Sequence, residues 1–184
     1  MAVSARYTVV LDACVLYPRL LRDVLLSLAH ADLYTARWTM EIEREWTASL
    51  LRKMPENEAS VARSVEMMRS AVPDCLVVDY ESLIGTLVLP DPKDRHVLAA
   101  AIRGNADAIV TFNTKDFPTA VLDTFDIELQ TPDQFVLNQL MLHPPRALSA
   151  IKRMRTRWES EFGSLAQGPS AICGLSTRRL NKST

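Results

Sequence analysis

Short apolar runs alternate with longer amphipathic segments along this chain. The first run, Tyr7–Leu11, is rich in β-branched residues and ends in Asp12, which is typical of a strand buried on both faces. Pro18 then opens an apolar stripe that predicts a helix to about His30, because proline is favoured in the first helical turn. Similar apolar runs predict further strands at Leu33–Trp38, Cys75–Val78, Ile109–Thr111 and Ile127–Leu129.

The segments between these runs have helical periodicity. Thr39 is a suitable N-cap for a helix over Met40–Leu51, and Gly104-Asn105 is a C-terminal stop for the apolar helix Lys93–Arg103. Other helices are predicted at Glu56–Val72, Tyr80–Thr86, Ala120–Thr124, from Thr131 onward and at Arg146–Phe162. Strands alternating with helices predict an α/β fold, a three-layer α/β/α sandwich with a mainly parallel five-stranded sheet and a C-terminal helical extension.

The composition is that of a globular protein. Hydrophobic residues make up 48% of the 184 positions and charged residues 23%, which argues against disorder. No apolar run approaches the roughly 18–20 residues of a membrane span, and the N-terminus has no signal-peptide pattern. The three cysteines are widely spaced and form no C-x-x-C pair. We therefore expect a cytoplasmic protein with no membrane contact and no structural zinc.

Charge is divided unevenly along the chain. Residues 1–144 carry 13 Lys/Arg and 20 Asp/Glu, whereas residues 145–184 carry 8 Lys/Arg and 2 Asp/Glu. This division predicts an acidic domain at residues 1–142 and a basic helical extension with a tail at residues 143–184. The extension either contacts a polyanion or is a solvated helix with a frayed end.

Acidic residues follow two of the predicted strands. Asp12 ends the first strand, and Asp116 lies just beyond Ile109–Thr111. Ligands of parallel sheets bind outside the carboxyl ends of the strands, so these acids meet if their strands are neighbours. Asp94 lies at the start of a helix, where it either shares a site with Asp12 and Asp116 or complements the helix dipole. Asp91 is better suited to capping this helix than to acting as a ligand. Carboxylates brought together repel unless a cation is present, and Mg²⁺ and Mn²⁺ prefer oxygen ligands.

Four segments in order resemble the PIN domain family, over about residues 7–137. They are Leu11-Asp12-Ala13, Trp38-Thr39 with Glu45 six residues after the threonine, LPDPKDRHVLAAA from Leu89, and IVTFNTKDFP from Ile109. The pattern is most similar to bacterial toxin-like PIN proteins of the VapC sort, including those with a C-terminal extension. The resemblance implies a metal-dependent endoribonuclease, the toxin of a toxin–antitoxin pair.

The resemblance also implies site residues, a cofactor and partners. The catalytic and metal-binding acids would be Asp12, Glu45, Asp94 and Asp116. Asp91 would be an accessory acid, and Thr111 and Asn113 would orient Asp116 or a substrate phosphate. Mg²⁺ or Mn²⁺ would activate the water that hydrolyses the RNA phosphodiester bond. Further partners would be a cognate antitoxin and a second copy in a homodimer, and candidate contacts to the RNA backbone are Lys152, Arg153, Arg155 and Arg157.

Each of these interpretations has a competitor. Glu45 lies beside Glu41 and Glu43 on a helix, where charged residues are usually solvated, and Asp116 is also suited to capping a turn. We interpret His96, Trp38 and Trp46 as packing or surface residues and Cys14 as a small apolar residue. The alternative function is a non-catalytic PIN-fold module for RNA binding or assembly. A phosphatase or receiver domain is disfavoured, because the second acid that either would carry after the first strand is absent.

Overall fold

The centre of the protein is a parallel sheet of four strands. A computed structural model describes residues 7–163, with side chains to residue 160, so the predicted tail at residues 164–184 lies outside the described residues. The strand order is β2-β1-β3-β4, with all neighbours parallel. The strands are β1 Thr8–Leu11, β2 Thr35–Arg37, β3 Ala108–Val110 and β4 Glu128–Gln130. β1 and β3 pair directly, so the strands before Asp12 and Asp116 are neighbours, which is the condition for a site that both acids share.

The prediction of a five-stranded sheet is wrong in one strand, Cys75–Val78. Within the described residues, the segment Cys75–Val78 forms an isolated parallel bridge between Trp38 and Leu76 and no longer ladder. Asp74 and Asp79 flank it in the left-handed conformation, with φ of 57° and 58°. The chain therefore turns at both ends of the segment before pairing can extend. The three-layer parallel α/β architecture is confirmed with four strands.

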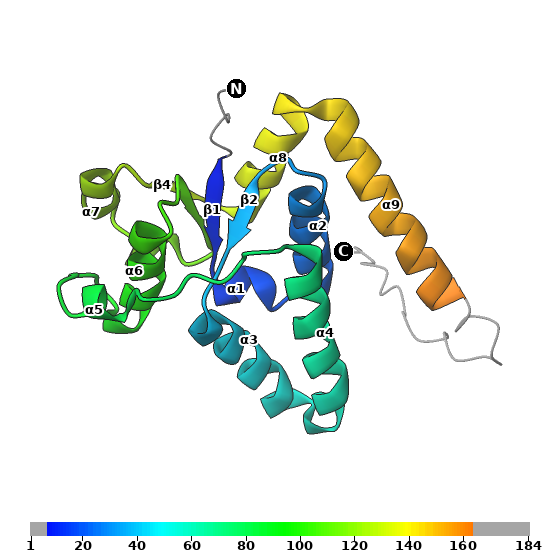
Figure 1. Cartoon of the computed structure of the whole chain (residues 1–184), viewed down its shortest axis with the longest axis horizontal. Coiled ribbons are helices and arrows are strands. Elements are labelled where there is room, and N and C mark those ends of the chain that lie inside the picture. The colour runs from blue at the N-terminus through cyan, green and yellow to red at the C-terminus, as the bar shows by residue number, and fades with distance from the viewer. Residues whose placement is uncertain (1–6, 164–184) are drawn as a thin grey trace, which may run out of the picture.

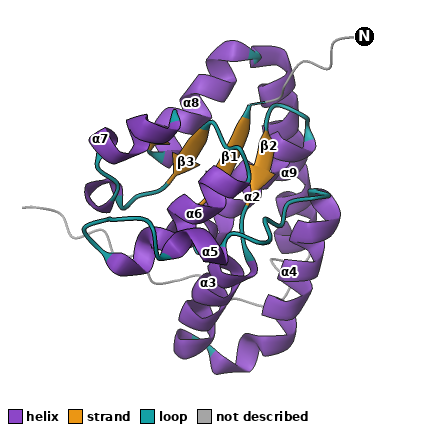
Figure 2. Ribbon diagram, turned by 60° about the vertical axis from the view of Figure 1, so that its left-hand side comes forward, coloured by secondary structure: helices purple, strands orange, loops and turns teal. Residues whose placement is uncertain are grey.

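Helices cover both faces of this sheet. α6 (Arg95–Arg103) packs on β1 and β3, and α2 (Arg19–His30) packs on β2, on the opposite side of the sheet in Figure 1. Figure 2 shows β3, β1 and β2 side by side behind α6. Three successive alanines of α6, residues 99–101, are fully buried, so the helix lies close to the sheet. The other helices are α1 Ala13–Leu16, α3 Met40–Lys53, α4 Glu58–Ala71, α5 Glu81–Ile84, α7 Thr119–Leu122, α8 Pro132–Leu142 and α9 Pro144–Gly163.

Glu43 of α3 forms an ion pair with Arg69 of α4. The two helices run side by side below the sheet in Figure 1. Glu43 Oε1 accepts hydrogen bonds from Trp38 Nε1 at 2.8 Å and from Arg69 Nε at 3.0 Å, and Arg69 Nη2 contacts Oε2. The Glu43 side chain is 6% exposed and that of Arg69 40%. A buried carboxylate needs such partners, so Glu43 has a structural role.

The C-terminal helix α9 lies along α2 (Figure 1). Trp158 Nε1 donates a hydrogen bond to Asp23 Oδ2 at 2.8 Å, and the Arg19 guanidinium stands 5.1 Å from the centre of the Trp158 rings. Arg157 Nη2 donates to Ser27 Oγ at 3.1 Å. The predicted helical extension is therefore confirmed, and it is docked on the domain. No helix in the described part of the chain is both long and apolar enough to span a bilayer.

Gly104 ends α6 in close contact with Val77. Its φ of −81° suits any residue, and the left-handed turn falls on Asn105, with φ of 46°. Glycine is needed here for space, because a Cβ at position 104 would lie 3.0 Å from the Ala100 carbonyl oxygen and 3.1 Å from Val77 Cγ2.

We expect Gly104→Ala to lower the free energy of unfolding by about 1–3 kcal/mol, because the added methyl overpacks this contact. Gly85→Ala is the matched control: Gly85 also follows a helix, has φ of −69°, and no described atom lies within 4 Å of its ideal Cβ position. That control should be neutral or gain about 0.4–1 kcal/mol from the less flexible unfolded chain. Urea unfolding measures both, and equal midpoints would contradict the expectation.

Candidate active site

Asp12 is the most constrained acid at the carboxyl end of the sheet. It follows β1 and is 7% exposed. Its Oδ2 accepts hydrogen bonds from Thr111 Oγ1 at 2.6 Å and from Cys14 Sγ at 3.1 Å, and its Oδ1 accepts from the Ala13 backbone N–H at 2.6 Å. Burial, followed by the charge of Asp12, raises the pKa of Cys14 to about 12, so the thiol stays protonated as a donor. These donors hold the Asp12 carboxylate in one orientation.

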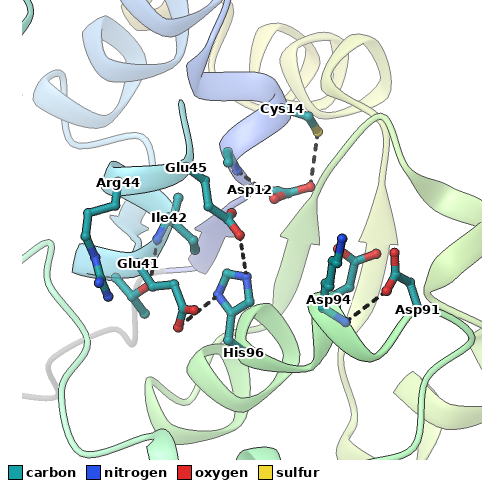
Figure 3. Close-up of polar contacts among 12 residues, drawn as sticks. Asp12, Cys14, Glu41, Ile42, Arg44, Glu45, Asp91, Asp94 and His96 are labelled. Carbon is teal, nitrogen blue, oxygen red and sulfur yellow. Dashed lines mark hydrogen bonds and ion pairs between the residues drawn. The ribbon is translucent and has the colours of Figure 1, made fainter. Parts of the chain in front are cut away.

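Asp94 lies directly before α6 but, among the described residues, makes no capping hydrogen bond to that helix. Its Oδ2 instead accepts from Asn113 Nδ2 at 2.8 Å. Asp91 is the residue that caps: its Oδ1 accepts from the Lys93 N–H at 2.9 Å, at the start of the 3₁₀ turn Pro92–Asp94. Figure 3 shows Asp91 and Asp94 on one side of Asp12.

Several acids share one electrostatic environment here. Burial, and then the charges of Asp12, Asp91 and Asp116, raise the pKa of Asp94 to about 6. Asp116 ends the 3₁₀ turn Thr114–Asp116 after β3 and is half-buried. Two of the other predicted acids, Asp12 and Asp116, are therefore close enough to repel the charge of Asp94, which favours a bound cation.

We expect Asp94→Asn to raise the unfolding temperature of the metal-free protein at pH 8. The raised pKa means that the ionised carboxylate destabilises the fold, and after screening of a half-buried group the gain is about 1 kcal/mol. That gain corresponds to about 2–4 °C for a protein of this size. Differential scanning fluorimetry with EDTA measures the shift, and added Mn²⁺ should stabilise the wild type more than the variant. A lower melting temperature for the metal-free variant would oppose this expectation.

The fourth predicted acid, Glu45, points toward a histidine. Figure 3 shows Glu41 and Glu45 of α3 facing His96 of α6. His96 Nε2 lies 3.2 Å from Glu45 Oε1, and Nδ1 lies 3.8 Å from Glu41 Oε2. Burial alone would lower the pKa of His96, but the hydrogen bond and charge of Glu45, with the charges of Glu41 and Asp12, raise it overall. His96 therefore carries positive charge over a wider pH range than usual.

The sequence interpretation missed two side chains of this site. The sequence predicts a packing or surface role for His96, although Glu41 and Glu45, four residues apart, place two acids on one helix face where a cation opposite them would be favourable. The sequence also predicts an apolar role for Cys14, yet Cys14 contacts Asp12 and Thr111 Oγ1, the latter at 3.2 Å. Its spacing of two residues from Asp12 was the available signal.

The other predicted residues are placed as follows. Thr111 and Asn113 contact Asp12 and Asp94 respectively. Their side chains make no hydrogen bond to Asp116 within the described residues, although the Asp116 N–H donates to the Asn113 carbonyl at 3.4 Å. The basic residues lie on α9, against α2 and across the sheet from α6 (Figure 1), so the fold does not bring them to the acids. Arg155 pairs with Glu159 at 2.7 Å. The roles assigned to all of these residues, and to Lys152 and Arg153, stay predictions.

Comparison with known families accounts for this arrangement. The model of the family described as PIN domain matches residues 8–115, more than half of the chain. The chain belongs to the PIN domain family. The PIN match runs from β1 into the turn after β3 and so contains the carboxyl ends of both central strands. A second model, described as VapC50 C-terminal domain, matches residues 132–161, which include α8 and most of α9.

The name of one similar protein states an activity. A protein of Mycobacterium tuberculosis named "Putative ribonuclease VapC50" is 47% identical over 62 residues, which are 34% of this chain and 37% of the relative. The matched part thus spans little more than a third of that relative's length. No solved structure gives a significant match. The predicted resemblance, a VapC-like PIN protein with a C-terminal extension, is confirmed.

Proposed function

We propose that this PIN protein is a metal-dependent endoribonuclease and the toxin of a toxin–antitoxin pair. The observation that supports the proposal is that Asp94, at the start of α6, lies within range of electrostatic repulsion from Asp12 after β1 and Asp116 after β3. A cation that relieves this repulsion would bind where an RNA phosphate can reach it. Membership of the PIN family and a relative named as a ribonuclease support the choice of substrate.

The donor set fits Mg²⁺ or Mn²⁺, because these hard ions prefer carboxylate oxygens and keep several waters. Asp12 and Asp94 would hold the ion, with Asp116 and Glu45 completing the set and Asp91 close by. In the conformation described, no three His, Cys, Asp or Glu side chains of residues 7–160 are spaced to ligate one ion. Glu45 is 43% exposed and Asp116 half-buried, so their side chains have room to rotate toward it.

The chain's own residues then position the reaction. Thr111 fixes Asp12, and Asn113 fixes Asp94, so the two acids bind at defined positions. His96 holds Glu45, which would have to leave this ion pair to ligate a metal. When bound by these acids, the ion would lower the pKa of a water ligand and neutralise charge on the phosphate. No side-chain base is then required, and the phosphodiester bond is cut by hydrolysis.

The partners belong to the same proposal. RNA is the substrate, a cognate antitoxin restrains the enzyme in the cytoplasm, and the active form is a homodimer. The exposed apolar side chains Leu20 and Met40, 55% and 57% exposed, support an antitoxin contact at the starts of α2 and α3. Much of the remaining α2 surface is already covered by α9.

The test uses the purified chain, free of any partner, with end-labelled single-stranded and structured RNAs. We expect cleavage in Mg²⁺ or Mn²⁺, loss of cleavage in EDTA, and recovery when excess Mn²⁺ is restored. Cleavage that persists in EDTA would refute the metal. RNA binding without cleavage, by protein shown calorimetrically to bind Mn²⁺, would instead favour a non-catalytic module.

A further inference from the structure

A groove of about 530 Å³ runs between α1 and α3, beginning at Glu45. Tyr17, the residue that ends α1, lines one wall. The other wall comes from α3 residues three or four positions apart, which share one face of a helix: Glu45, Trp46, Ser49, Arg52 and Lys53. Cys14, which contacts Asp12, also lines the groove, so the groove lies next to the candidate active site.

The charge along this wall changes sign. Arg52 and Lys53 lie seven and eight residues after Glu45, which is about 10–12 Å along the helix axis. Both cations are exposed, and neither pairs with a carboxylate of residues 7–160. Arg52 Nη2 donates to Ser49 Oγ at 3.1 Å, and Lys53 Nζ stands 5.1 Å from the centre of the Tyr17 ring. A negatively charged strand entering the groove would meet these cations a few nucleotides from the acids.

Trp46, which also lines the groove, has an unused hydrogen-bond donor. It is 1% exposed, yet its Nε1 has no hydrogen-bond partner among the described residues. The Arg22 guanidinium packs over its rings at 4.6 Å, and Arg22 Nη1 is itself bound to the Leu16 carbonyl at 2.7 Å. Because this Nε1 is itself buried, Trp46 contributes packing to the groove wall and not a hydrogen bond to the ligand.

We propose that the groove binds the single-stranded RNA segment next to the scissile phosphate, with a base stacked on Tyr17 and phosphates bound by Arg52 and Lys53. The inference rests on the proposed ribonuclease function and assigns the substrate path for that site. Aromatic side chains interleaved with cations are the combination that binds single strands, because every base offers a stacking face and every nucleotide a charge. Cations in a last helical turn also complement the helix dipole, but that role requires no ligand.

The first experiment isolates the cations. Binding of a fluorescent single-stranded RNA to the full chain is measured by anisotropy in EDTA at several salt concentrations. We expect Arg52→Gln with Lys53→Gln to weaken binding several-fold and to lower the slope of log affinity against log salt by about 1.4, the value for two lost phosphate contacts. The control, Arg63→Gln with Arg103→Gln, removes the same charge from exposed positions on α4 and in the last turn of α6 and should leave the slope unchanged.

The second experiment isolates the ring. Tyr17→Leu should weaken RNA binding roughly 5- to 100-fold, the range for loss of one base–aromatic stack, whereas Tyr17→Phe should stay within about twofold. Stabilisation of each variant by Mn²⁺ in a melting assay should match the wild type, which shows that fold and acids are intact.

The outcomes separate this inference from the function on which it rests. One outcome is that the wild type cuts RNA while the groove variants bind RNA as tightly as the control variant does. The groove is then not the RNA path, and the proposed ribonuclease function is unaffected. If the groove variants lose binding to a protein partner but keep RNA, the groove belongs to that partner and the inference is overturned. If the wild type neither binds nor cuts RNA, both proposals fail.

Discussion

Asp12→Asn should reduce metal-dependent RNA cleavage by roughly 100- to 1,000-fold, the scale on which loss of one electrostatic partner acts at a transition state. The substitution removes the charge that would bind the metal and keeps the shape of the side chain. An asparagine oxygen still accepts from the Ala13 N–H, and the Thr111 hydroxyl rotates to accept from the new NH₂ group. We therefore expect a folded protein whose chemistry is lost.

Asp107→Asn is the matched control for this variant. Asp107 precedes β3, and its Oδ2 accepts from the Thr8 N–H at 2.6 Å, so it lies at the amino ends of the same two strands. Single-turnover cleavage in Mn²⁺ compares the two variants with the wild type. If Asp12→Asn retains cleavage, or if both variants lose cleavage equally, the reaction site is not at the carboxyl end of the sheet.

Glu43→Ala should lower the free energy of unfolding by about 2–3 kcal/mol. Breaking a buried ion pair by removing one partner costs about 3–5 kcal/mol, and the lower figure allows for Arg69, which is 40% exposed. The truncation leaves Trp38 Nε1 without its acceptor and Arg69 without its carboxylate. It therefore loosens both the start of α3 and its contact with α4.

Glu45→Ala is the control for Glu43→Ala, since it makes the same truncation two residues away. Its side chain is 43% exposed, and its buried partner His96, unlike an arginine, can lose its proton when the carboxylate is removed. We therefore expect a smaller destabilisation, below about 1 kcal/mol. If Glu45 ligates the metal, Glu45→Ala should instead lower the rate of RNA cleavage. Urea unfolding and cleavage assays on both variants should thus give opposite patterns, and destabilisation by Glu45→Ala greater than by Glu43→Ala would contradict the structural assignment.

Local chemistry was enough to predict the order of elements and the position of Asp12. Thr39 does cap α3, accepting from the Ile42 N–H at 3.1 Å, and Thr131 forms a capping box with Gln134 at the start of α8. Such signals act over three or four residues, so they can be read from the chain. The alternation of strand and helix then predicted the parallel sheet that brings β1 beside β3.

Contacts between distant segments decided the rest. Cys75–Val78 has the composition of a strand, but in the described part of the chain only Leu76 pairs, with Trp38 just after β2. Glu41, Glu43 and Glu45 have the same side chain on one helix, and only the packing of α4 and α6 shows that Glu43 binds Arg69 while the other two face His96. Sequence by itself determined the family, the fold class and the acids near strand ends, because these follow from periodicity and local motifs. Tertiary structure decided which acids are structural, because burial and charge partners depend on residues far apart in the chain.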